Sequence, residues 1–294
     1  MSTPVLFDRP LLRARRRRAQ TLGPATFLLD RVAEDFTDRL AAILRRFDLA
    51  VDLGTPSDAA RRVLRGKVGA VIGADHVPIG CADYEVIADA EALPFRDGTL
   101  DLVISLLALQ FVNDLPGTLV QIRRALKPDG LFLAALFGGD TITELRQAFA
   151  AAEAEMEGGM SPRIAPFADL RDLGGLLQRA GFALPVTDVD RVVVRYETPL
   201  ALMHDLRRMG ATNPLVERRR TPLRRATLMR MAEIYAERFA DADGRVRATF
   251  EIIWLSGWAP HESQQQPLAP GSAKMRLADA LGSREISAGE KAPR

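Results

Sequence analysis

The residues best suited to chemistry include a short pattern that ends in Asp52, Leu53 and Gly54. An apolar run leads into them, which is typical of a buried strand that enters a tight turn. Glycine permits a backbone with positive φ and lets that backbone come close to a ligand. The next residues, 55–58, include a proline, which has no N–H to donate, and an additional carboxylate. We therefore expect a ligand site at Gly54, with fewer backbone donors than a glycine-rich turn provides.

Other polar residues follow apolar stretches that we predict to be strands. Asp75 and Asp89 each come after such a stretch, and Ser105 lies near the end of a third one. Ligands of open α/β sheets bind beyond the carboxyl ends of the strands, where a carboxylate can accept hydrogen bonds from ribose hydroxyls. We assign that role to Asp75, and we expect Asp89 to accept from an adenine amino group with Ala90 beside the ring. The alternatives are a surface-loop acid for Asp75 and an ordinary strand-end loop for Asp89.

A further acid, Asp140, follows a glycine pair at the end of another predicted strand. Its carboxylate could bind a substrate guanidinium, because the two groups match in bidentate fashion. The alternative is that Asp140 caps the helix that begins near Ile142, a role for which Thr141 competes. Arg163 either lines the same cleft or closes a loop.

These residues need a scaffold, and the chain predicts one in which strands and helices alternate. The alternation predicts a doubly wound α/β sheet. The predicted strands cover residues 50–53, 68–72, 84–88, 100–106, 131–137, 188–196 and 247–258. The predicted helices within this part cover residues 58–64, 113–126, 141–157 and 166–180, with a turn at residues 127–130.

Three further parts complete the predicted organisation. Residues 1–46 form a basic N-terminal region with helices over 11–20 and 25–46. Residues 47–261 hold the α/β domain, in which residues 198–240 form a small helical lobe. Residues 262–294 are rich in Pro, Gln, Ser and Ala, and we expect this tail to be disordered.

Composition narrows the function classes. The 294 residues are 47% hydrophobic and 27% charged, which is typical of a soluble globular chain. We expect no membrane span, because no apolar run reaches about 18 residues, and no signal peptide, because no apolar segment follows the first arginines. The net charge of +2 predicts no nucleic-acid partner. A single cysteine, Cys81, excludes an internal disulfide and indicates a reducing compartment, cytoplasmic in a bacterium and mitochondrial in a eukaryote.

Positive charge is concentrated in two segments. Residues 9–18 hold six arginines and no acid, and residues 207–225 hold seven arginines against Glu217. One interpretation is that these are solvated helix faces. The other is that they dock an acidic protein or the anionic lipid surface of the inner membrane.

Several motifs resemble the methyltransferase type 11 family of class I S-adenosylmethionine (SAM)-dependent methyltransferases. They lie at residues 52–54, 89–95, 100–103 and 126–130. Other motifs are similar to one branch, the assembly factor 5 or arginine-hydroxylase family of mitochondrial complex I with its alphaproteobacterial relatives. They lie at residues 7–9, 111–116, 137–141, 157–163, 209–213 and 257–258. The similarity extends over nearly all of residues 5–275.

The resemblance implies a seven-stranded, Rossmann-like class I methyltransferase sheet with an N-terminal helical cover and a small helical lobe. It also implies that SAM is the cofactor, held by Asp52, Gly54, Asp75, Asp89, Ala90 and Ser105. The implied substrate is an arginine of a peripheral-arm subunit of NADH:quinone oxidoreductase (complex I), modified during assembly by hydroxylation or methylation. Asp140 is the candidate contact for that arginine.

Two motifs depart from the family pattern. Residues 55–58 replace Cys-Gly-x-Gly, so we predict weak SAM binding, with Asp58 placing a negative charge near the carboxylate end of SAM. Gln110-Phe111 replaces His-Trp, which makes Gln110 a second catalytic candidate. The alternative function is a non-catalytic complex I assembly chaperone that has lost SAM.

Other chemistries find little support in the chain. A non-haem iron site requires two histidines and a carboxylate. The chain has only His76, His204 and His261, with no His-x-Asp pair, so we predict no metal site. It has no Walker-type phosphate loop either.

Overall fold

A computed structural model describes residues 5–77, 79, 82–265, 272 and 275–284. It divides into two compact units, Met1–Pro260 and His261–Arg294, which we treat separately. Cys81 lies outside the described residues. In the second unit the structure describes one short helix, α9 (Leu277–Leu281), and most of the tail that we expected to be disordered lies outside the described residues.

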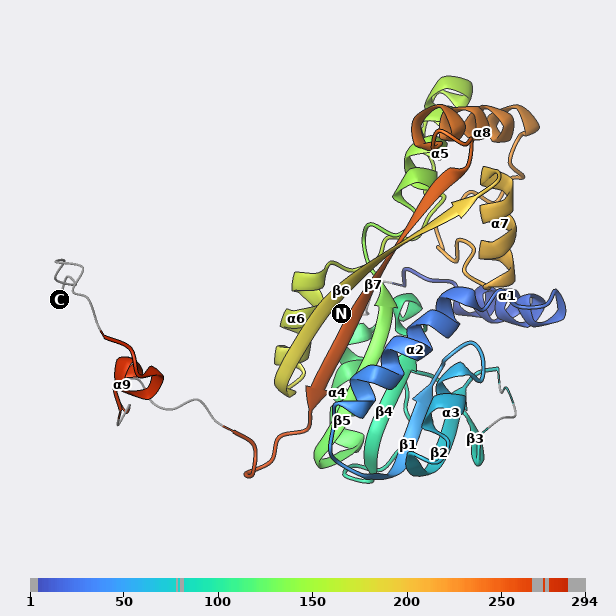
Figure 1. The fold of residues 1–294 in the computed structure, drawn as a ribbon. Helices are drawn as coiled ribbons and strands as arrows, with labels where there is room; N and C mark the ends of the chain where they lie inside the picture. Colours follow the sequence, from blue (N-terminus) through green and yellow to red (C-terminus); the bar gives the residue numbers. More distant parts are fainter. Residues whose placement is uncertain (1–4, 78, 80–81, 266–271, 273–274, 285–294) are drawn as a thin grey trace. The chain divides into compact units, whose positions relative to one another are not determined.

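A seven-stranded mixed sheet forms the centre of the first unit, as predicted (Figure 1). Its strand order is β3-β2-β1-β4-β5-β7-β6. The first five strands pair in parallel, whereas β7 is antiparallel to β5 and β6. The strands are β1 (Phe47–Leu53), β2 (Val68–Asp75), β3 (Tyr84–Ile87), β4 (Leu100–Leu106), β5 (Leu126–Phe137), β6 (Ala183–Tyr196) and β7 (Val246–Trp258). Every residue of β4 is buried, as expected of a central parallel strand.

Helices cover both faces of this sheet. One core contains residues of α2 (Phe27–Ala41) and α3 (Ala59–Leu64), and the other contains residues of α4 (Leu115–Ala125) and α6 (Leu170–Arg179). The reversal of strand order between β1 and β4 opens a crevice at the carboxyl ends of these strands. A short 3₁₀ helix, η1 (Leu109–Phe111), follows β4 at this edge.

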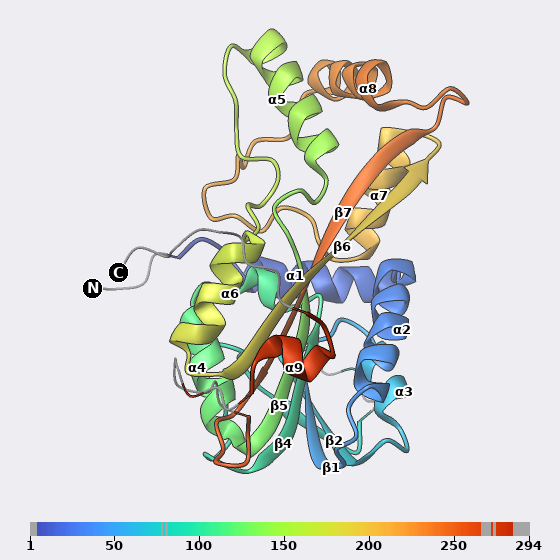
Figure 2. The ribbon, with the colours of Figure 1, turned by 60° about the vertical axis from the view of Figure 1, so that its left-hand side comes forward.

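The N-terminal helix α1 (Arg9–Thr21) lies across that edge of the sheet (Figures 1 and 2). Asp8 caps its first turn by accepting from the N–H of Leu11 at 3.0 Å, and Pro10 occupies the first turn. Two residues of the helix itself, Leu12 and Ala19, are buried. The predicted N-terminal cover is therefore a helix that lies over the carboxyl edge of the parallel strands (Figure 1).

The lobe contains more than the predicted residues 198–240. α7 (Pro199–Arg208) and α8 (Arg225–Phe239) fall in that range, but α5 (Thr143–Glu157) packs against α8, and the far halves of β6 and β7 extend toward them (Figure 2). Residues of all three helices belong to the same apolar core as β5 and β7. The lobe is therefore an extension of the domain's own core.

Some predicted boundaries moved because of individual hydrogen bonds. α4 begins at Leu115 because Asp114 caps it by accepting from Gly117 N at 2.9 Å, and α6 begins after Asp169, which caps it in the same way. The predicted turn at residues 127–130 is instead an irregular part of β5. There Asp129 has φ +62° and donates its N–H to Ala259 O, which keeps this segment in the sheet.

Candidate functional site

The glycine turn after β1 has the predicted backbone. Gly54 has φ +74°, and a Cβ on it would lie only 3.2 Å from the Cβ of Ala108, so a side chain there would be strained and tightly packed. Thr55 is fully buried, and its Oγ1 accepts a hydrogen bond from Leu106 N at 3.1 Å. The turn is thereby joined to the end of β4.

Asp58 differs from our expectation. Its carboxylate lies 3.4 Å from the guanidinium of Arg62, one turn along α3, and it is exposed. Pro56 and Ser57 face the cavity described below, but Asp58 is not among its lining residues. The negative charge that we expected at the site is therefore directed away from it.

Asp75 lies at the end of β2, where a ribose-binding carboxylate was predicted, and it is only 5% exposed. The guanidinium of Arg16 from α1 holds it, with Nη1 3.1 Å from Oδ1 and Nη2 2.8 Å from Oδ2. The second contact is not aligned as a hydrogen bond, so within the described residues the buried Oδ2 has no hydrogen-bond donor. An acceptor in this state fits a ligand hydroxyl.

Asp89, after β3, binds a second arginine of α1. Its Oδ1 accepts from Arg9 Nη2 at 2.6 Å and from Glu91 N at 2.9 Å, and its Oδ2 lies 3.1 Å from His76 Nε2. Partial burial raises the pKa of Asp89, but the Glu91 N–H, Arg9 and His76 outweigh that effect and hold the pKa below its usual range. The carboxylate is therefore ionised and held in place.

Asp52 and Ser105 are buried beneath the site. Asp52 Oδ2 accepts from Arg61 Nε at 2.9 Å, and Arg61 also donates to Glu85 at 2.7 Å. Burial raises the pKa of Asp52 to about 6, although a Thr55 hydrogen bond and Arg61 partly oppose it. Ser105 donates to Leu53 O at 2.7 Å. Asp52 therefore connects β1 to α3, and Ser105 connects β4 to β1. Neither residue lines the two cavities described next.

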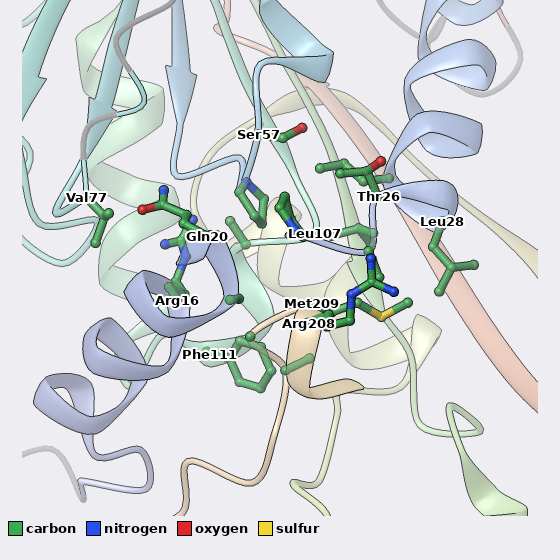
Figure 3. Close-up of a pocket in the computed structure, with 18 of the residues that line it drawn as sticks. Arg16, Gln20, Thr26, Leu28, Ser57, Val77, Leu107, Phe111, Arg208 and Met209 are labelled. Carbon is green, nitrogen blue, oxygen red and sulfur yellow. The ribbon is translucent and has the colours of Figure 1, made fainter. Parts of the chain in front are cut away.

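Two cavities lined by described residues open at this edge of the sheet. The carboxylate cavity, of about 470 Å³ including its open mouth, is lined by Gly54, Asp75, His76, Ala88 and Ala90 together with residues of α1. The apolar cavity, of about 870 Å³ including its mouth, lies between α1, α2, the glycine turn, the end of β4 and the end of α7 (Figure 3). Both are lined by Leu12, Arg16, Ala108 and Phe111, so the two cavities adjoin each other, and we call them together the cleft.

Gln110 is the candidate that the structure places in the apolar cavity. It is only 9% exposed, and its Nε2 donates to Leu107 O at 2.8 Å. Its Oε1 has no partner in the described part of the chain. A buried amide oxygen without a donor costs free energy, which a ligand N–H would recover.

Asp140 lies outside both cavities. Its side chain is 53% exposed and pairs with Arg191 of β6, and its N–H donates to Glu251 at 2.9 Å. Its side chain does not cap α5 either, since the residue at that N-cap is Ile142, with a left-handed backbone. Arg163 closes a loop, because it pairs with the buried carboxylate of Glu153, and it lines a separate cavity in the lobe.

Sequence reasoning missed the arginines that bind the candidate carboxylates. Arg9 and Arg16 are seven residues apart on a helix, which is two turns and therefore one face. This spacing, together with two acids at strand ends, was the available signal. No group of three His, Cys, Asp or Glu residues within the described ranges could hold a metal ion, and no helix there is long and apolar enough to span a membrane.

Comparison with known proteins gives the following relatives. A methyltransferase domain model matches residues 51–134. The mitochondrial arginine-hydroxylase NDUFAF5 of Danio rerio is 39% identical over 290 residues, covering 93% of this chain and 89% of that protein. The Homo sapiens protein of the same name is 40% identical, covering 93% and 83%. A malonyl-[acyl-carrier protein] O-methyltransferase of Xylella fastidiosa is 41% identical over 60% of this chain and 57% of its own.

Solved structures agree on the fold. A putative methyltransferase from Bacillus halodurans superposes with a TM-score of 0.54 at 16% identity, covering 77% of this chain and 98% of that one. The YcgJ protein of Bacillus subtilis superposes with a TM-score of 0.53 at 14% identity. The fold is therefore that of class I methyltransferases.

Proposed function

The chain belongs to the family of the arginine-hydroxylases NDUFAF5, and from this premise we propose that it binds SAM in the cleft under α1 and modifies a protein arginine. We further propose that the arginine belongs to a peripheral-arm subunit of NADH:quinone oxidoreductase and is modified during assembly. The observation that carries the proposal is the buried Asp75 at the end of β2 in a methyltransferase fold, whose Oδ2 is held by an ion pair with Arg16 but accepts no aligned hydrogen bond within the described residues.

The residues of the carboxylate cavity fit the nucleoside part of SAM. Asp75 offers its Oδ2 to a ribose hydroxyl, and the small side chains of Ala88 and Ala90 leave room for a planar ring. Gly54 has no side chain, so the backbone of its turn can come close to a ligand in this cavity. When bound, SAM would supply an electrophilic methyl group, and the chain's own residues would position it and exclude water.

We place the target arginine side chain in the apolar cavity. Gln110 Oε1 can accept an N–H from a guanidinium, and the apolar walls, which include Leu28, Leu107 and Phe137, can contact the methylene stem. None of the described residues lining this cavity is acidic and two of them, Arg16 and Arg208, are cationic, so recognition would rest on the amide and on shape and would have to overcome like charge. We leave Asp140 outside the proposed reaction site because it pairs with Arg191 away from the cleft.

Calorimetric titration with S-adenosylhomocysteine tests the cofactor part. We expect the native protein to bind, and Asp75→Asn to bind about tenfold or more weakly, because a hydrogen bond to a charged group contributes about 1.5–3 kcal/mol. Asp97→Asn is the matched control, since Asp97 is an exposed acid that pairs with Arg124 far from the cleft. Native protein that does not bind would refute the cofactor assignment.

The second candidate function is a non-catalytic assembly chaperone with the same fold. The observation that favours it is that Arg9 and Arg16 already occupy the carboxylates that would hold the nucleoside. Mass spectrometry of the subunit distinguishes the candidates: hydroxylation adds one oxygen atom, methylation adds one methylene unit, and a chaperone leaves the arginine unchanged.

A further inference from the structure

Arg16 lies at the junction of the two cavities and lines both of them. Its guanidinium holds Asp75 on one side, and its Nη2 also donates to Gly54 O at 2.5 Å. Its side chain is 19% exposed, so a charged group is held with little solvent at the centre of the cleft. A ligand that occupies both cavities would therefore lie beside Arg16.

The backbone around Arg16 is fixed, so only its side chain can respond to a ligand. Gly210, with φ +70°, packs so closely that a Cβ on it would lie 3.2 Å from the Cα of Arg16. The neighbouring Arg15 donates to Thr212 O at 2.9 Å, and Leu12 and Ala19 are buried on the same helix. An arginine side chain has several rotatable bonds, so its guanidinium can move between two partners while α1 stays in place.

The glycine turn lacks donors for an anionic group. Pro56 has no N–H, and Pro56 and Ser57 line the apolar cavity that Arg16 also lines. The charged residues among the described lining of this cavity are Arg16 and Arg208, and none is acidic. A carboxylate that entered beside the turn would therefore find a guanidinium where related folds offer backbone donors.

We propose that Arg16 exchanges Asp75 for the carboxylate of the amino-acid end of the cofactor, and thereby selects nucleosides that carry that carboxylate. The proposal rests on the proposed function, because it needs the nucleoside in the carboxylate cavity. The exchange frees Asp75 for ribose hydroxyls and keeps the guanidinium paired throughout. A nucleoside without the carboxylate has to displace Arg16 from Asp75 with no compensating partner, and so binds poorly.

The exchange predicts opposite effects of one substitution on two ligands. Arg16→Gln removes the partner of the ligand carboxylate, so S-adenosylhomocysteine should bind about tenfold or more weakly. The same change removes the competitor for Asp75, so 5′-methylthioadenosine, which lacks the amino-acid end, should bind several-fold more tightly. Arg16→Lys, which keeps the charge, should retain part of the preference for S-adenosylhomocysteine.

Calorimetric titration of both ligands into native protein, Arg16→Gln, Arg16→Lys and Arg17→Gln measures this. Arg17 is the matched control, because it is an exposed arginine of the same helix and lines neither cavity. Melting temperatures verify that each variant is folded. If Arg16→Gln is unfolded, the preference of Arg16→Lys for S-adenosylhomocysteine decides instead: a reduced preference supports the exchange, and an unchanged one contradicts it.

Three results would overturn the exchange. Equal weakening of both ligands in Arg16→Gln would make Arg16 a general contact, and unchanged affinities for both ligands would make it a bystander. Either result would leave the cofactor assignment standing. Failure of native protein to bind either ligand would refute the exchange together with the proposed function.

Discussion

The hydroxyl of Thr55 joins the glycine turn to the end of β4, and its contribution can be measured. Thr55→Val keeps the shape but leaves the buried N–H of Leu106 without its acceptor. We expect a loss of about 1–3 kcal/mol in the free energy of unfolding, which is the cost of a buried unsatisfied donor. Thr55→Ser keeps the hydroxyl and should lose less. Urea unfolding decides between them, and equal stability of the Val variant and the native protein would show that this hydrogen bond contributes nothing.

Asp52 gives a prediction for pH dependence. Burial raises its pKa to about 6, so the folded protein binds this proton more tightly than the unfolded chain does. The stabilising contribution of the proton is complete below the unfolded pKa and is lost as the pH rises through the folded one. Between about pH 5 and pH 7.5, native protein should lose about 1 kcal/mol relative to Asp52→Asn. Urea midpoints of both proteins across this range test the sign. A native protein that gained stability relative to Asp52→Asn as the pH rises would contradict the prediction.

At the residue scale, the sequence predicted acids at strand ends but not their partners. Asp75 and Asp89 lie where the pattern of strands placed them, since parallel strands bring their carboxyl ends to one edge. The pairing of Arg9 and Arg16 with these acids could not be predicted, because the local sequence does not determine which face of the basic helix packs on the sheet. Gln110 was named from a family difference, and its unpaired oxygen became visible only in the packed structure.

At the element scale, the packing of α1 against Gly210 connects the lobe to the cleft. Gly210→Ala introduces a side chain at φ +70° and at 3.2 Å from Arg16 Cα. Gly244→Ala is the matched control, since its φ is +81° but nothing lies within 4 Å. Each change should cost about 1–2 kcal/mol for the left-handed backbone, and Gly210→Ala should cost more and weaken binding of S-adenosylhomocysteine. Equal melting temperatures and affinities for the two variants would show that α1 is not held by this contact.

Most elements were predictable because alternation and apolar runs are local signals. The central strand at residues 100–106 is correct to the residue. The predicted turn at residues 127–130 was wrong, because pairing with Ala259, far away in sequence, keeps Asp129 within β5. The extent of the lobe was also not predictable, since α5 joins it through packing on α8.

At the scale of the whole molecule, the structure changes which arginines are free to dock a partner. Arg218 pairs with Asp8 at 3.1 Å and Arg219 pairs with Glu157, so reversing their charge would disturb the fold. Arg220, Arg224 and Arg225 are exposed, and no ion pair of theirs is found within the described ranges.

Reversing these three charges to Glu should weaken salt-sensitive co-purification with NADH:quinone oxidoreductase subunits by about tenfold, because steering by surface charge is strong at low salt. The control reverses Arg96, Arg171 and Arg179, which are exposed elsewhere and give the same net charge. Equal capture of subunits by both triple variants across a salt series would remove the docking surface.

The most direct test of the account is the state of the target arginine in cells. Cells without the native gene would carry the native protein, Asp75→Asn or the control Asp97→Asn, and mass spectrometry would measure the modified fraction of arginines in the peripheral-arm subunits. We predict full modification with the native protein and the control, and loss of modification with Asp75→Asn at unchanged protein level. A fully modified arginine with Asp75→Asn, or an unmodified one with native protein, would contradict the claim that this cleft performs the reaction.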